Sequence, residues 1–202
     1  VFKCWGNSIS DIVENETKLE IMMAFSSSNK RILDAINGLE SKEEKDKLLL
    51  KESNSMFENI LGLAAQSEDH RQRIRLIRYL YAKDQLRIKL CVSCDENKEN
   101  LSLAHNKIGY FLNENNTYTS FMGSMNESES AVMRNGEDLM VFDSSEDNDS
   151  EGALKIRQKF DAKWANEDPY SIVFSPNRKI IEKVKEISDI KDKKEALEVT
   201  KK

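Results

Sequence analysis

The chain has 202 residues, of which 39% are hydrophobic and 33% charged, proportions typical of a globular protein with one domain or one domain plus a helical extension. A net charge of −5 argues against a protein that coats nucleic acid indiscriminately. The densest apolar run, residues 19–25, is too short to cross a bilayer, and no signal-peptide pattern opens the chain. We therefore expect a cytoplasmic protein that does not bind a membrane.

The first half of the chain predicts a strand, a series of helices and a second strand. The second strand, 85–93, is the clearest, because apolar residues from Leu86 to Val92 alternate with Arg87 and Lys89. The charged stretch 40–52 predicts a helix with little to bury, which we expect to lie outside the core. The other elements expected here are a strand at 17–25 and helices at 28–38, 56–66 and 68–84.

The helix expected at 68–84 belongs to a basic part of the chain. Seven basic residues and one acid occur between Arg71 and Lys89. Apolar residues from Ile74 to Tyr81 predict its buried stripe, which leaves arginines on the outer face. This face could contact a polyanion, and a merely solvated helix face is the alternative. The candidates for nucleic-acid contact are Arg71, Arg75 and Arg78.

Three cysteines include Cys91 and Cys94, whose "CVSC" spacing could form half of a zinc or redox site. No second pair accompanies them, and Cys4 is left over. An odd number of cysteines without a secretion signal favours a reducing compartment. We expect no metal ion and no cofactor.

The second half of the chain predicts a hairpin followed by further strands and helices. Strands at 106–112 and 118–124 flank the polar turn "NENNT". Strands separated by helices and then a hairpin are typical of an α/β domain with a mixed sheet flanked by helices. The later elements expected are a short helix at 128–134, a strand at 137–142, an acidic loop, a helix at 153–168, an extended segment at 170–176, a helix at 178–190 and a charged end that frays.

Polar residues cluster around the two hairpin strands. Residues two apart in a strand point to the same side, so His105 and Lys107 present an imidazole and an ammonium together. A hairpin with its tip at 113–117 brings His105 beside residue 124 or 125, close to Ser124 and Asn126. Glu137 stands just before the following strand, where its carboxylate could reach the imidazole.

These residue types suit cleavage of a phosphodiester without a metal ion. Lys107 can place positive charge on the phosphate oxygens, and Asn126 can add neutral donors. His105 can attack phosphorus while Glu137 holds its tautomer. A metal mechanism would need clustered carboxylates, and the nearby acids belong mostly to the acidic loop. From spacing alone, an exposed pair at a strand edge without catalytic function remains the favoured interpretation.

The segments "HNKIGYF", "GSMNES" and "NGE" resemble the HxK, GSxNxS/T and NxE signature of the phospholipase D superfamily. The similarity is greatest to its nuclease-like branch, which includes metal-independent restriction endonucleases and domains attached to DNA helicases. "RIRLIRYLYAKDQLRIKLCV" and "FDAKWANED" also resemble segments of the helicase-associated group. The resemblance implies a phospholipase-D-like α/β/α domain over residues 1–177, a helical insertion at about 40–66, and a C-terminal helix and charged tail at 178–202.

The resemblance also implies roles for individual residues. The superfamily's usual Asp after HxK falls near Leu112 or Asn113, so that carboxylate is absent from this chain. The implied roles are nucleophile for His105, phosphate binding for Lys107 and Asn126, support of the motif turn for Ser124, and orientation of the histidine for Glu137.

The superfamily mechanism uses two histidines, whereas this chain has one HxK. Its other histidine, His70, has no partner lysine and is expected at the surface. The resemblance therefore implies a homodimer in which two copies of His105 meet across a two-fold axis. The expected function is a metal-independent phosphodiesterase acting on DNA, with a helicase or ATPase of a restriction or defence system as a further partner. The alternatives are a catalytically silent nucleic-acid-binding or dimerisation module and a lipid phosphodiesterase.

Overall fold

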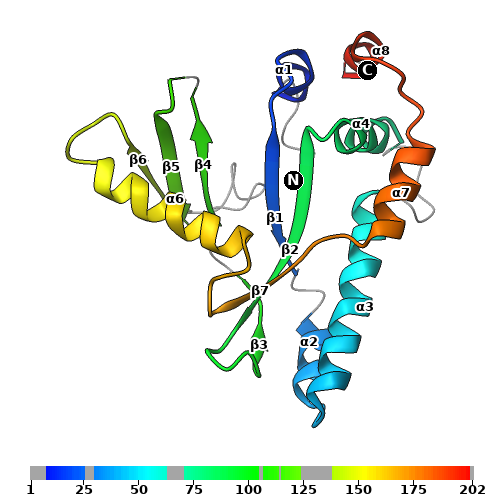
Figure 1. Ribbon diagram of the computed structural model, residues 1–202, viewed down its shortest axis with the longest axis vertical. Helices are drawn as coiled ribbons and strands as arrows, with labels where there is room; N and C mark the ends of the chain where they lie inside the picture. Colours follow the sequence, from blue (N-terminus) through cyan, green and yellow to red (C-terminus); the bar gives the residue numbers. More distant parts are fainter. Residues whose placement is uncertain are drawn as a thin grey trace. The chain divides into compact units, whose positions relative to one another are not determined.

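Figure 1 shows the computed structural model of the protein, which describes residues 8–25, 30–62, 71–104, 107–113, 115–123 and 138–200. The chain forms two compact units. The sheet unit consists mainly of residues 24–30 and 91–173, and the helical unit of residues 2–23, 31–90 and 174–202. Both units contain helices and strands, which confirms the α/β class expected from the sequence. The described strands are divided between two sheets.

The helical unit buries one face of each of its helices around an apolar core. Helix α4 packs against α7 and α8, and α8 also packs against α1. Val13, Ile36 and Val184, which come from three different helices, are at most 1% exposed. The elements of this unit are α1 (Ser8–Glu14), β1 (Leu19–Ala24), α2 (Lys30–Asn37), α3 (Lys42–Ile60), α4 (Arg71–Ala82), the first half of β2 (Leu86–Cys94), α7 (Arg178–Ile187) and α8 (Lys193–Thr200).

Strand β2 has the alternation that its sequence predicts. Leu86 and Ile88 are buried, whereas Arg87 is exposed. In the second half of the strand both faces are covered, because Cys91 is buried as well as Val92. The alternation of apolar and polar residues therefore identified the strand correctly. The burial of both faces at the end of the strand depends on segments far away in the sequence, so the alternation did not predict it.

Helix α3 differs from the two separate helices expected between residues 40 and 66. It runs without a break from Lys42 to Ile60 and buries Leu49 and Phe57. In its first part, residues 42–52, only Leu49 is buried, which agrees with the expectation that this part has little to bury. The buried hydroxyl of Ser53 donates to the Leu49 carbonyl at 2.7 Å within the helix, so this polar group has a partner inside the element.

The charged end of the chain forms helix α8, where the sequence indicated fraying. Asp192 accepts a hydrogen bond from the backbone N–H of Glu195 at 2.9 Å, an interaction that stabilises a helix start. Ala196 and Val199 are buried. The expected fraying of this segment is wrong because α8 buries two small apolar side chains and packs against α1 and α4.

The sheet unit contains the predicted hairpin. Strands β4 (Lys107–Leu112), β5 (Tyr118–Gly123) and β6 (Leu139–Asp143) form an antiparallel sheet in the order β4-β5-β6. The short helix expected at 128–134 lies outside the described residues. The other elements of this unit are the second half of β2, β3 (Leu101–Ser102), α6 (Ser150–Trp164) and β7 (Ser171–Phe174), with β3 and β7 both paired to β2.

Helix α6 lies across one face of the three-stranded sheet (Figure 1). The buried hydroxyl of Ser120 in β5 donates to the Ala153 carbonyl at 2.9 Å. The phenol of Tyr110 in β4 donates to Asp161 at 3.0 Å, and its ring packs edge-on against Phe160. These contacts attach the helix to the strands that carry the sequence motifs.

Candidate active site

The register of the three-stranded sheet brings into one row three described residues that belong to the sequence motifs or follow them closely. Lys107 pairs with Gly123, and Gly123 pairs with Leu139. Lys107 is the lysine of "HNK", Gly123 is the glycine of "GSMN", and Leu139 follows "NGE" after one intervening residue, Asp138. Three segments that are distant in the sequence therefore meet at the same end of the three strands.

Four of the five predicted site residues, His105, Ser124, Asn126 and Glu137, lie outside the described residues. The structure places the fifth, Lys107, at the first position of β4. The covalent chain links His105 to Lys107 through one residue, Ser124 directly to Gly123, and Glu137 directly to Asp138.

Gly123 allows an unusually close approach between β5 and β6. A Cβ atom at this position would collide with the carbonyl oxygen of Asp138 and would lie 3.0 Å from the Cα atom of Leu139. Both neighbours are backbone atoms, which cannot rotate away as a side chain can. Only glycine fits this position without a shift of the adjoining strand.

The sheet face that carries Lys107 is rich in apolar side chains. Alternation along the strands places Phe111, Phe121 and Val141 on this face, opposite α6. The rings of Phe111 and Phe121 are 5.6 Å apart, and Phe111 and Val141 are 67% and 54% exposed. Exposed apolar groups of this size in one patch are typical of a surface that another molecule covers.

The opposite face of the sheet holds a cationic side chain between aromatic rings. The guanidinium of Arg157 in α6 lies 4.7 Å from the centre of the Tyr118 ring and 5.2 Å from that of Tyr110. Asp161 lies 3.7 Å from Arg157 and also accepts the hydrogen bond from Tyr110. This cluster stabilises the contact between α6 and the sheet from the side away from Lys107.

The two candidate cysteines of the "CVSC" segment are core residues. Cys91 and Cys94 are buried and make no disulfide. Burial raises the pKa of both thiols, which disfavours the thiolate that binds metals or takes part in redox exchange. No group of three His, Cys, Asp or Glu side chains with metal-site geometry occurs in the part of the chain that the structure describes.

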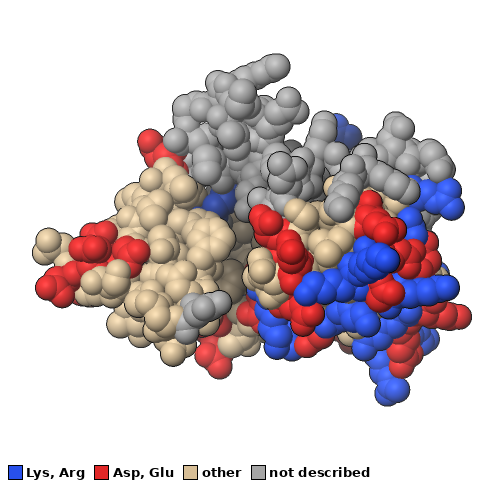
Figure 2. Space-filling view, turned by 90° about the horizontal axis from the view of Figure 1, so that it is seen from above, with Lys and Arg blue, Asp and Glu red and all other residues tan. Residues whose placement is uncertain are grey.

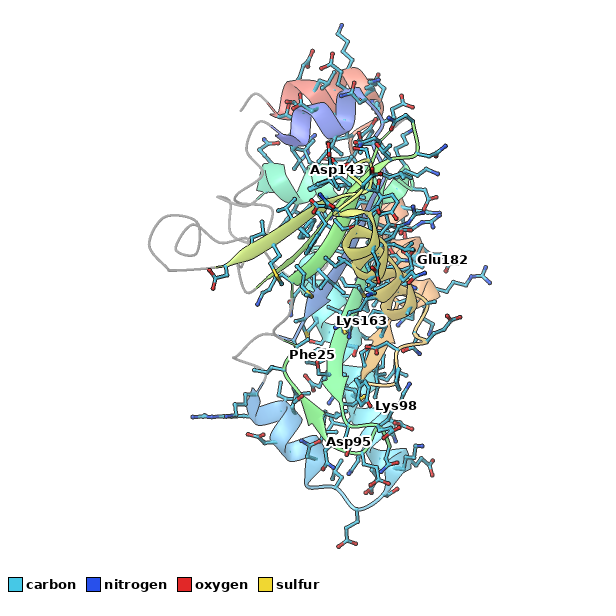
Figure 3. All side chains as sticks on the ribbon, turned by 90° about the vertical axis from the view of Figure 1, so that its left-hand side faces the viewer. Phe25, Asp95, Lys98, Asp143, Lys163 and Glu182 are labelled. Carbon is cyan, nitrogen blue, oxygen red and sulfur yellow. The ribbon has the colours of Figure 1, made fainter. Side chains whose placement is uncertain are left out.

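A partly buried ion pair lies at the end of α6. The ammonium of Lys163 is 2.5 Å from Asp168, and both side chains are 16% exposed (Figure 3). Burial alone would raise the pKa of the Asp168 carboxyl, but hydrogen bonds from Lys163 and Ser171 outweigh it and hold that pKa below its usual range. This pair joins the end of α6 to the start of β7.

The arginines proposed for nucleic-acid contact have partners within the chain. Arg75 donates to Asp189 at 2.7 Å and to Glu195 at 3.4 Å, and its side chain is 21% exposed. Arg78 donates to the carbonyls of Leu61 and Gly62 at the end of α3. Arg71 is exposed. The prediction that all three occupy the outer face is therefore wrong for Arg75 and Arg78, which are partly buried.

The surface charge is mixed over the helical unit. Figure 2 shows lysines and arginines interspersed with acidic residues there, whereas the other part of the described surface in this view is mostly uncharged, with acids at one end. Asp143, at the end of β6, accepts hydrogen bonds from Ser145, which lower the pKa of its carboxyl (Figure 3). The described residues visible on this face therefore form no uniformly basic surface.

Comparison with known proteins identifies the family but no individual relative. The family model of the cardiolipin synthase, PLD-like domain, matches residues 9–164, which is more than half of the chain. No curated protein and no solved structure gives a significant match. None of the described helices is both long and apolar enough to cross a bilayer. The family match over residues 9–164 shows that the chain belongs to the phospholipase D superfamily, whose members act on phosphodiesters.

Proposed function

We propose that the protein is a metal-independent phosphodiesterase that cleaves DNA through a covalent phosphohistidine intermediate. The observation that carries this proposal is the row of paired residues Lys107, Gly123 and Leu139, each of which belongs to one of the three motifs or follows it closely in the sequence. Superfamily membership supports chemistry on a phosphodiester. The nuclease branch is supported by the resemblance of the three motifs to nuclease-like members.

In the proposed reaction His105 attacks phosphorus and one P–O bond of the diester breaks. The leaving oxygen takes a proton from a second histidine, and water then cleaves the P–N bond to release the other half of the substrate. Lys107 and Asn126 neutralise the charge that develops on the nonbridging oxygens. Glu137 orients the imidazole of His105 as a third group orients the base of a catalytic triad.

The second histidine is supplied by a second copy of the chain. The sequence contains a single HxK, and its other histidine, His70, has no partner lysine. The exposed apolar face that carries Lys107, with Phe111 and Val141, supports an interface on the same side as the site. A homodimer would bring two copies of His105 to one phosphate.

The proposed biological partner is a helicase or ATPase of a restriction or defence system. This part of the proposal rests only on the resemblance of the sequence to helicase-associated domains. DNA as the substrate also rests on that resemblance, because Arg75 and Arg78 already bind groups of this chain. The name of the matched family includes a lipid enzyme, so a lipid diester is the competing substrate. The substrate test therefore includes both classes.

The proposal is tested by cleavage assays in excess EDTA with plasmid DNA, bis(p-nitrophenyl) phosphate and phosphatidylglycerol vesicles as separate substrates. We expect cleavage of DNA and of the generic diester, and loss of both in His105→Ala. Cleavage of lipid alone would replace DNA as the substrate. Dependence on added metal would overturn the mechanism, and retained DNA binding without cleavage would identify a catalytically silent module.

A further inference from the structure

The sheet face that carries Lys107 holds an exposed pair of aromatic rings. Phe111 is 67% exposed, the highest value among the large apolar side chains that the structure describes. The tip of the Phe121 ring fills the space of an absent side chain, since its Cζ atom is 2.5 Å from where a Cβ atom on Gly109 would lie. The two ring centres are 5.6 Å apart, and the ring planes are 34° from parallel. Phe121 therefore covers one side of Phe111, and the other side of the Phe111 ring is open to solvent.

The charged groups of this face lie at opposite ends of the strands. Lys107 is the one cation among the described strand residues of the face, and Phe111 follows it four residues later in β4. At about 3.3 Å per residue, the ring is roughly 13 Å from the lysine along the strand. The row of paired residues that contains Phe111 runs through Thr119 to Asp143, whose carboxylate is negative at neutral pH. A ligand of this face therefore needs an anion near the lysine and an uncharged group that can stack on the ring.

We propose that the Phe111 ring is a stacking platform for a base of single-stranded DNA whose reacting phosphate is bound at Lys107. Single-stranded DNA combines anionic phosphates with flat, uncharged bases whose faces are accessible. A base does not fit between the two phenylalanine rings, because stacking on both would need about 7 Å between them, so the base lies on the open side of Phe111. The inference rests on the proposed function for the presence of a phosphate at Lys107.

The charge of this face favours single-stranded DNA over the other molecules that could cover it. Duplex DNA is bound mainly through its phosphates and needs several cations, whereas a stacked base adds affinity without charge. A protein that lies on a bilayer surrounds its apolar face with basic side chains, but the described strands offer this face one lysine and the acidic Asp143. In the proposed homodimer the DNA strand runs between the two copies, and Phe111 contacts the DNA instead of the partner subunit.

The test measures the binding of fluorescent oligonucleotides to the full chain by anisotropy, in a His105→Ala background so that no probe is cleaved. The probes are an oligothymidine, an abasic strand of the same length and a duplex of the same length. We expect Phe111→Ala to raise the Kd for oligothymidine by about 5- to 150-fold, the usual cost of losing one stacked base, and to leave the Kd for the abasic strand and for the duplex unchanged. Phe111→Trp keeps the affinity because it keeps an aromatic surface.

Leu112→Ala is the matched control for Phe111→Ala. Leu112 is the next residue of β4, is 56% exposed and lies on the opposite face of the sheet. Its replacement removes a comparable exposed apolar side chain, and we expect the Kd for every probe to stay within about twofold of the background value.

Binding and cleavage test different claims. Binding of oligothymidine that depends on Phe111, in a protein whose wild type cleaves no phosphodiester, would support the platform and overturn the proposed function. Cleavage of a generic diester by a wild-type protein that binds no oligothymidine would support phosphodiester chemistry and overturn the platform.

Four further results would overturn the inference. Phe111→Ala could bind oligothymidine as tightly as Leu112→Ala does. It could lose equal affinity for the abasic strand, which would mean that no base stacks on the ring. It could weaken binding to phosphatidylglycerol vesicles and not to oligothymidine, which would identify a lipid-binding face. Finally, sedimentation velocity could show that Phe111→Ala is a monomer while Leu112→Ala remains a dimer, in which case the ring belongs to an interface between two copies of the chain.

Discussion

At the scale of single residues, the site begins with one lysine at the start of a strand. Lys107 is the first residue of β4 and pairs across the sheet with Gly123. A lysine ammonium is a compact charge on a flexible stem, and it can follow the phosphate oxygens as their charge grows during the reaction. Its position on a hydrogen-bonded strand fixes the base of that stem.

Replacement of Lys107 by Met keeps an unbranched side chain close to that of lysine in length and removes the charged ammonium group. We expect kcat/KM for a generic phosphodiester to fall by about 100- to 1,000-fold, the usual cost of removing one donor to a developing oxyanion. Lys98→Met, in the exposed turn between β2 and β3, is the control (Figure 3). Equal activity of the two variants in a steady-state assay would show that Lys107 does not bind the reacting phosphate.

Asp168 gives a prediction about stability and pH. Its pKa is lowered in the folded protein, so its ion pair with Lys163 stabilises the fold above the ordinary carboxyl pKa of about 4 and stops doing so as the pH falls through the folded value. Asp168→Asn should therefore reduce the free energy of unfolding at pH 7 by about 3 kcal/mol and flatten its decline below about pH 4. Urea titrations at several pH values measure both effects.

The control for Asp168 is Glu182→Gln, which breaks an exposed pair. Glu182 and Arg178 are 59% and 90% exposed, and such pairs contribute less than about 1 kcal/mol (Figure 3). A loss in Asp168→Asn no larger than in this control would contradict the structural role given to the Lys163 pair.

At the scale of elements, α6 supports the motif strands from the face away from Lys107. Ser120 is completely buried and links the middle of β5 to the Ala153 carbonyl near the start of α6. The ring of Phe142 in β6 packs against Gly152 of the same helix, where a Cβ would come within 2.7 Å of the ring. Tyr110 of β4 also donates to Asp161 of α6, so the helix restrains all three strands whose ends form the row.

Ser120→Ala tests this support. We expect a loss of about 1 kcal/mol in the free energy of unfolding, because the variant gives up one buried hydrogen bond without creating a large cavity. Ser102→Ala, at an exposed position of β3, should change stability by less than about 0.5 kcal/mol. Thermal unfolding of both variants measures the difference, and equal midpoints would show that the hydroxyl of Ser120 does not hold α6 to β5.

The elements that the sequence predicted are those with local signals. The period-two pattern identified β2, and the polar turn between two apolar segments identified the hairpin. The sequence left two registers open, and the structure has the one that places Lys107 opposite Gly123. Strand β3 was missed because it has only two residues and forms by pairing with β2. The partners of Arg75 could not be predicted either, since Asp189 and Glu195 are 114 and 120 residues away in the sequence.

In the candidate site too, the features with a local sequence signal were predicted and those that depend on distant segments were not. Hairpin counting predicted that the HxK and GSxN segments meet, and the register confirms this for Lys107 and Gly123. The close approach of Asp138 to Gly123 depends on how β6 pairs with β5, which no local pattern specifies. A glycine at the end of a strand pattern was the one available signal, because such a glycine often marks a close backbone approach.

At the scale of the whole molecule, the proposed enzyme is a dimer with one shared site. The test uses a heterodimer of one wild-type chain and one His105→Ala chain, isolated with two affinity tags. Its shared site contains one copy of His105 instead of two, so it lacks either the nucleophile or the general acid. We expect its activity to be about 100-fold or more below that of the wild-type dimer, the usual contribution of a general acid. Half of the wild-type activity would show instead that each chain carries a complete site, as would full activity in a monomer.

The most direct test of the proposed mechanism is the capture of the covalent intermediate. Wild-type protein and His105→Ala are mixed with bis(p-nitrophenyl) phosphate in excess EDTA, quenched within milliseconds at alkaline pH, where phosphohistidine survives, and digested for mass spectrometry. We predict a nitrophenyl-phosphoryl group on the peptide that contains His105, together with a burst of p-nitrophenol, and neither signal in His105→Ala. Steady turnover without an adduct on His105, or with an adduct on another residue, would contradict the mechanism.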